Sequence, residues 1–282
     1  RLVHARRALL AVALTLSGEL PGVGWSDARA ITREPSASAG LEAQHAAPGY
    51  GVGGGIGSLV AGMWDMNGDG WETAIGGRPS WGAQGNQDDA FFGYSVASAG
   101  DVNGDGYADV IVGAYLYDNG QTDEGRAFVY LGSPTGMART PAWTAEGDQH
   151  KAYFGVSVAS AGDVNGDGYG DVIVGADNYS NDQTYEGRAF VYLGSPAGLA
   201  RTAAWTAEGD QNSAFFGYSV ASAGDVNGDG FGDVIVGALG YDNGQYQEGR
   251  ALVYVGSPMG LARTPAWTAE GDRDFAYFHS VA

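Results

Sequence analysis

The residues of this chain that are best suited to chemistry lie in one short pattern, Asp-Val-Asn-Gly-Asp-Gly-x-x-Asp. It occurs three times, at residues 101–109, 163–171 and 225–233. Carboxylate and amide oxygens at alternate positions of a loop can converge on one point, and glycine permits the sharp turn that this requires. Hard cations such as Ca²⁺ take about six to eight oxygen ligands. The pattern therefore predicts three calcium loops.

The predicted ligands are the side chains at the first, third, fifth and ninth loop positions and the backbone carbonyl at the seventh, with water completing the shell. They are Asp101, Asn103, Asp105, Tyr107 and Asp109 in the first loop, Asp163, Asn165, Asp167, Tyr169 and Asp171 in the second, and Asp225, Asn227, Asp229, Phe231 and Asp233 in the third. A fourth, weak metal site is predicted at Asp65, Asn67 and Asp69, where Thr73 replaces the last carboxylate.

Two other interpretations of these loops compete with calcium binding of this kind. An EF-hand needs a bidentate Glu at the twelfth position, which is Val112, Val174 or Val236 here. Asp, Asn and Gly also form ordinary turns, and a single copy could be no more than that. Three copies with every oxygen position filled favour calcium.

The elements that must position these loops repeat every 62 residues. Phe92, Phe154, Phe216 and Phe278 keep this step, and so do Trp81, Trp143, Trp205 and Trp267. Within one period, β-rich runs at 94–99, 109–114, 126–131 and 142–145 are separated by turn signals such as Asn103-Gly104. Four short strands per unit predict an all-β protein made of stacked four-stranded antiparallel blades, a β-propeller. A β-solenoid is the alternative, although its coils are usually shorter.

The step also predicts how the chain is divided. We expect a signal peptide at 1–30, a linker at 31–49, a degenerate partial repeat at 50–91, full repeats at 92–153, 154–215 and 216–277, and the start of a truncated repeat at 278–282. Three full units and parts of two more predict an incomplete or open propeller.

Composition limits the possible partners and the cellular location. A net charge of -19, with 14 basic against 33 acidic residues, argues against nucleic acid as a partner. The absence of Cys excludes disulfides, zinc thiolates and a Cys nucleophile. Basic residues before the apolar run 8–16, followed by Ala28-Arg29-Ala30, predict export to the cell surface or the medium. A short buried helix is the other interpretation of this run, which is too short to span a membrane.

The repeated residues favour binding over catalysis. No Gly-x-Ser-x-Gly elbow, phosphate loop or metalloprotease helix motif is present, and His45, His150 and His279 are isolated in the sequence. An active site is needed once, whereas the tryptophans and Arg126, Arg188 and Arg250 occur in every unit. We expect the tryptophans to pack between sheets, with stacking on sugars as the alternative role.

The order of motifs resembles a known family. Phe92-Gly93, the calcium loop and Gly113-Ala114 spell the elements of an FG-GAP repeat, and Phe154-Gly155 with Gly175-Ala176 and Phe216-Gly217 with Gly237-Ala238 repeat them. The resemblance, to the N-terminal β-propeller of integrin α-subunits, covers about residues 50 to 282. It implies a propeller, usually of seven blades, with calcium in loops between the first two strands of certain blades, and adhesion or ligand recognition at an exposed face. The chain is more similar to exported bacterial proteins of this type than to an animal receptor.

These observations predict a calcium-binding extracellular module for adhesion or protein interaction, and not an enzyme. The ligand, protein or glycan, is expected at the variable loops 115–124, 178–186 and 239–248. The alternative is a calcium-stabilised, lectin-like propeller within a larger exported enzyme. Asn178-Tyr179-Ser180 fits a glycosylation sequon, so glycosylation of Asn178 stays open as an interpretation.

Overall fold

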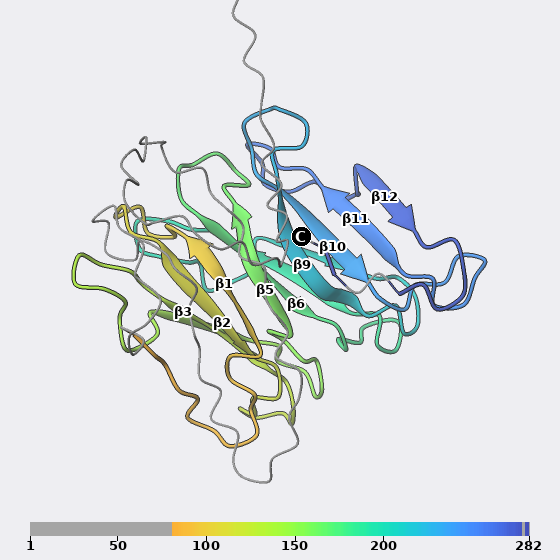
Figure 1. The fold of residues 1–282 in the computed structure, drawn as a ribbon, viewed down its shortest axis with the longest axis horizontal. Helices are drawn as coiled ribbons and strands as arrows, with labels where there is room; N and C mark the ends of the chain where they lie inside the picture. The colour runs from red at the N-terminus through yellow and green to blue at the C-terminus, as the bar shows by residue number, and fades with distance from the viewer. Residues whose placement is uncertain (1–80, 278–279, 282) are drawn as a thin grey trace, which may run out of the picture. The chain divides into compact units, whose positions relative to one another are not determined.

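The computed structural model describes residues 81–277 and 280–281, which form twelve strands in three four-stranded antiparallel sheets (Figure 1). No helix occurs among these residues, and none in this part of the chain could cross a membrane. In each sheet, every strand pairs with the next one along the chain. The prediction of an all-β fold built from four-stranded blades is confirmed, and the three blades of the described residues form an open propeller that is not closed into a ring.

The strands of the three blades follow the 62-residue step. The first blade contains β1 (Ser95–Gly100), β2 (Asp109–Ala114), β3 (Arg126–Tyr130) and β4 (Trp143–Glu146); the second contains β5 (Ser157–Gly162), β6 (Asp171–Ala176), β7 (Arg188–Tyr192) and β8 (Trp205–Glu208); the third contains β9 (Phe216–Gly224), β10 (Asp233–Ala238), β11 (Arg250–Tyr254) and β12 (Trp267–Glu270). They differ from the predicted runs by about a residue at most ends.

After its leading aspartate, the second strand of each blade is a continuous apolar run because both of its faces are covered. β6 has the sequence Asp-Val-Ile-Val-Gly-Ala, and all six of its residues are buried. A strand covered on one face only would show alternating burial. By contrast, β4 and β8 are four-residue edge strands in which only the leading tryptophan is buried.

The hydrophobic core lies between blades. One cluster joins Ile111, Val129 and Trp143 of the first blade to Phe154 and Val172 of the second, and a second cluster joins the second blade to the third in the same way. Phe154 and Phe216, which open the second and third full repeats, are fully buried in these two clusters. A single blade therefore buries its apolar surface only against its neighbours.

The tryptophans connect successive blades. The indole N–H groups of Trp81, Trp143 and Trp205 donate to carbonyl groups of the next repeat, those of Ala138, Ala200 and Ala262, at 2.8, 2.8 and 2.9 Å. Their rings pack edge-on against Tyr130, Tyr192 and Tyr254. The predicted packing role is confirmed for these three. Trp267, at the same position of the last described period, is 52% exposed.

A serine also links each blade to the next. Ser95 Oγ accepts a hydrogen bond from the backbone N–H of Val158 at 2.9 Å, and Ser157 Oγ accepts one from Val220 at 3.1 Å. Ser219 Oγ does the same for Val281, at 3.1 Å. The first strands β1, β5 and β9 accordingly lie side by side (Figure 1).

The glycines of the two named motifs meet across this interface. A Cβ on Gly113 would lie 2.0 Å from the carbonyl oxygen of Gly155, and one on Gly175 would lie 1.9 Å from that of Gly217. Gly155 also donates its N–H to Gly175 of its own blade at 2.9 Å. The Phe-Gly glycine of one blade thus lies against the Gly-Ala glycine of the blade before it.

Candidate functional site

The three predicted calcium loops connect the first and second strands of each blade, at one end of the sheets. In the first loop Gly104 and Gly106 have φ values of 71° and 88°, which glycine adopts readily. Asp101 accepts hydrogen bonds from the backbone N–H groups of Gly104, Asp105 and Gly106 at 2.7, 3.0 and 2.7 Å. The same three bonds are made by Asp163 and Asp225 in their loops.

The ninth-position aspartate anchors each loop to the blade. Asp109 is fully buried, and its two carboxylate oxygens accept hydrogen bonds from Val102 and Gly132, both at 2.8 Å. Burial raises the pKa of Asp109 to about 6; the two hydrogen bonds lower it, and the charges of Asp105 and Asp101 raise it. The pKa of Asp171 is also raised to about 6, with burial again the main cause.

The oxygen atoms of the first loop retain the capacity to bind a cation. A carboxylate offers about four lone-pair sites. Asp101 uses three of them, and Asp105 and Asp109 use two each. Asn103 Oδ1 accepts one bond, from Asp105 at 3.2 Å. The donor set, all oxygen and negatively charged, is the kind that calcium prefers.

The loops are nevertheless not drawn together around one point. Among the described residues, the three carboxylates of a loop do not all lie within 4.8 Å of one another. A cation that contacted all three carboxylates of a loop would therefore have to draw them closer together, and the ligand sets remain predictions. The weak site predicted at Asp65, Asn67 and Asp69 lies outside the described residues.

Aromatic side chains gather at the opposite end of the sheets, where the β2–β3 and β4–β5 connections lie. Phe91 and Tyr94 are exposed. Their ring centroids lie 5.6 and 4.5 Å from that of Tyr115, which in turn is 5.6 Å from Tyr153. We call these four residues the aromatic cluster. It includes the start of the predicted ligand loop 115–124.

A buried carboxylate beside this cluster breaks the repeat. Asp177 occupies the position held by Tyr115 and Leu239 in the other two blades. It is 7% exposed, and its Oδ1 has no hydrogen-bond partner. Burial raises its pKa to about 7. The tyrosines of the aromatic cluster have pKa values raised by burial and, to a smaller extent, by the charge of Asp177. Sequence reasoning missed Asp177, although its departure from the repeat was a signal.

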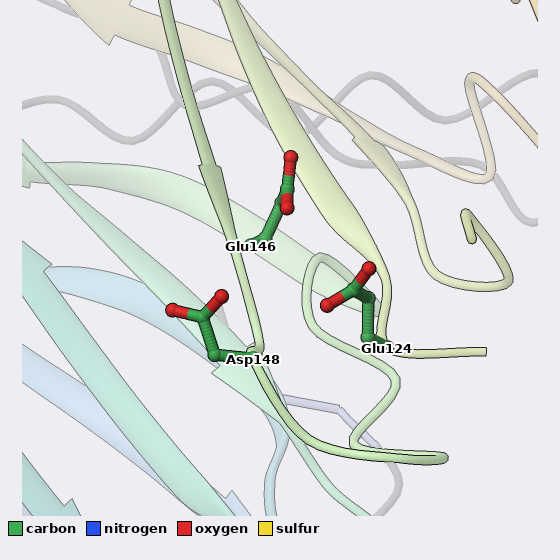
Figure 2. Close-up of side chains that lie close together, drawn as sticks. All are labelled: Glu124, Glu146 and Asp148. Atoms are coloured by element: carbon green, nitrogen blue, oxygen red, sulfur yellow. The ribbon is translucent and has the colours of Figure 1, made fainter. Parts of the chain in front are cut away.

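A second acidic group, also missed, lies at this end of the first blade. One carboxylate oxygen from each of Glu124, Glu146 and Asp148 lies within 4.8 Å of the others (Figure 2). Glu124 precedes β3, whereas Glu146 and Asp148 lie at and just beyond the end of β4. Arg126, opposite Glu146 in the β3–β4 pair, forms an ion pair with it. The recurring Glu-Gly-Arg sequence was the available signal.

Comparison with known proteins matches this architecture. An FG-GAP repeat model matches residues 92–130, 154–192 and 216–254. Integrin alpha-5 of Xenopus laevis is 33% identical over 205 residues, 68% of this chain and 19% of the relative. Integrin alpha-PS2 of Drosophila melanogaster is 40% identical over 129 residues, 43% of this chain and 9% of the relative. Integrin alpha-8 of Mus musculus is 31% identical over 194 residues, 67% and 17% respectively. The chain thus spans less than a fifth of the length of these curated relatives.

Proposed function

Because this chain is an FG-GAP repeat protein that resembles the propeller of integrin α-subunits, we propose that it is an extracellular module for adhesion or protein interaction, stabilised by calcium. Each matched segment opens one of the proposed 62-residue repeats, at 92–153, 154–215 and 216–277. The proposed role is binding and not catalysis.

The observation that carries this proposal is the aromatic cluster beside Asp177. Tyr115 and Asp177 occupy the same position of successive repeats and differ there, so this position can distinguish one partner from another, whereas Phe91 and Tyr153 share a position that is aromatic in every repeat. Exposed aromatic side chains are enriched at protein interfaces, where they supply large contact areas. Asp177 is buried, Oδ1 included, so it would influence the ligand through the tyrosines around it and not by direct contact. Together they support a ligand face at the β2–β3 loops.

Calcium has a supporting role in this proposal. The three loops lie at the end of the sheets opposite the aromatic cluster, so the ions would act on the blades and not on the ligand. In a chain without Cys, they would hold the first two strands of each blade together outside the cell. About three ions are proposed, one for each of the complete loops.

The ligand face is tested with immobilised extracellular matrix proteins and a glycan array, each probed with and without calcium. We compare the wild-type chain with Tyr115→Ala and with Asp177→Leu, which installs the residue of the third blade. Met259→Ala is the control, because Met259 is 94% exposed and lies in the β11–β12 connection, away from the cluster.

Loss of one interface anchor costs about 1–2 kcal/mol, or roughly five- to thirty-fold in affinity. We expect such losses for both face variants and wild-type binding for Met259→Ala. If both face variants bind protein as tightly as the wild type, the ligand face is wrong. Calcium-dependent binding to glycans without binding to any protein would replace the proposal with the lectin alternative.

A further inference from the structure

We propose that Glu124, Glu146 and Asp148 form a second type of cation site, separate from the three loops, which binds Ca²⁺ at the opposite end of the first blade. Three carboxylate oxygens lie within 4.8 Å of one another, which is about twice a Ca²⁺–oxygen distance of 2.4 Å. One cation can therefore contact all three without a large rearrangement of the chain.

The buried side chain of Glu124 offers an unused ligand atom at this position. Its side chain is 0% exposed, and Oε2 has no hydrogen-bond partner. Figure 2 shows its carboxylate turned toward the segment that carries Glu146 and Asp148. A buried carboxylate oxygen without a partner is costly, so such groups are usually paired or bound to metal.

The local charge balance favours a cation as well. The guanidinium of Arg126 pairs with Glu146 and compensates one of the three carboxylates. Two negative charges remain, one of them buried on Glu124. A divalent ion neutralises both, and the oxygen-only donors and the exposed position of Asp148 leave room for water in the shell.

The site would connect two loops of the proposed ligand face. Glu124 ends the β2–β3 loop and Asp148 begins the β4–β5 connection. These segments already meet through the backbone bond from Lys151 N–H to the Thr122 carbonyl at 2.8 Å. A bound ion would hold them together more firmly. The cation site itself does not depend on what that face binds.

The other blades provide a matched control. Glu186 and Glu248 are also buried with one unpaired carboxylate oxygen. Within the described residues, however, only the first blade brings three acidic side chains within the 4.8 Å limit. Glu186→Gln therefore makes the same chemical change as Glu124→Gln at a position where no complete cluster exists.

The first test counts Ca²⁺ ions bound to the full chain by equilibrium dialysis and metal analysis. Glu124→Gln and Asp148→Asn should each bind one ion fewer than the wild type, whereas Glu186→Gln should match it. Asp148 is exposed, so its variant keeps the proposal testable if Glu124→Gln fails to fold. An unchanged ion count and affinity in Asp148→Asn overturns the site, and equal losses in Glu124→Gln and Glu186→Gln overturn its assignment to one blade.

The second test uses Lys151, the only lysine in the chain, so that a lysine-specific protease cuts at a single point within the β4–β5 connection. In the wild type and in Glu186→Gln, Ca²⁺ should slow this cut several-fold. In Glu124→Gln and Asp148→Asn, the part of the protection that comes from this site should be lost, although the three calcium loops remain intact. Equal protection in all four proteins contradicts the proposal.

Discussion

Gly113 and Gly155 meet backbone to backbone across the interface of the first two blades, where a Cβ on Gly113 would lie 2.0 Å from the Gly155 carbonyl oxygen. Real Cβ atoms essentially never come that close to another heavy atom, so these two backbone segments can approach each other only with glycine at this point. The contact recurs between Gly175 and Gly217. The two motifs therefore occur together because the Gly-Ala motif of one blade packs against the Phe-Gly motif of the next blade.

Gly113→Ala should separate the first two blades locally. Added atoms in a well-packed interface cost about 1–3 kcal/mol, and here the neighbour is backbone, which cannot rotate away. We expect a loss of at least this size in the free energy of unfolding, measured by urea titration. Gly82→Ala is the control, because a Cβ there would meet nothing within 4 Å. Equal stability of both variants would contradict the interpretation.

Trp143→Phe should weaken the joint between the first two blades while keeping an aromatic ring there. The change removes the hydrogen bond to the Ala200 carbonyl and leaves that acceptor without its partner, at a cost of about 1–3 kcal/mol. Trp267→Phe changes the same residue in the same Trp-Thr-Ala-Glu strand, where the side chain is 52% exposed. We expect a change below about 0.5 kcal/mol there. The measurement is the free energy of unfolding of both variants. Equal losses would contradict the role of the Trp143 hydrogen bond in joining the blades.

Asp177 should make the metal-free protein less stable as the pH rises. Burial raises its pKa from the ordinary value of 3.8 to about 7, so the folded state binds the proton more tightly than the unfolded chain. Between these values the folded state holds more protons, and the free energy of unfolding falls with pH by up to about 1.4 kcal/mol per unit. The stabilisation is fully present below about pH 4 and lost above about pH 7.

The measurement is urea unfolding at several pH values from 5 to 8, in the presence of chelator. Asp177→Asn should lose less stability across this range than the wild type. Asp109 and Asp171 titrate in the same direction but are present in both proteins, so the difference isolates Asp177. Parallel stability curves for the two proteins would show that Asp177 does not titrate in this range. Tyr94, Tyr115 and Tyr153 are the ionisable groups coupled to it.

Chelation should lower the melting temperature. Extracellular calcium modules bind with dissociation constants of about 0.1–1 mM, so about 10 mM calcium adds roughly 1–3 kcal/mol per occupied site. Asp163→Asn with Asp167→Asn should remove the increment of one loop and leave the others. Asp182→Asn, an exposed aspartate outside the loops, should keep the full response. A melting temperature that ignores chelator in the wild type would refute calcium stabilisation.

Much of the fold could be predicted because its signals are local. The 62-residue step, the turn residues and the apolar runs define four strands per unit, and the structure places them within about a residue of the predicted ends at most positions. The oxygen pattern of the calcium loops is equally local, since its residues are neighbours in the sequence. Burial of tryptophan could be anticipated from its recurrence in every unit.

The parts that were missed depend on packing between distant segments. Glu124 and Glu146 come together only because β3 pairs with β4 in the register that places Arg126 opposite Glu146. The burial of Asp177 depends on the fit between neighbouring blades, and a single sequence carries no such information. The sequence does show that Asp177 departs from the repeat. It does not show that the aspartate side chain is buried.

The serine bonds described above have one geometry throughout: Ser95 to Val158, Ser157 to Val220, and Ser219 to Val281. Each blade therefore has two different sides, and every joint is head-to-tail, a heterologous contact rather than a self-complementary one. The contacts at such a joint do not depend on how many units precede it. A gene built from nearly identical segments can gain or lose a whole unit by unequal recombination, and the new junction in the protein will have the same contacts as the old ones.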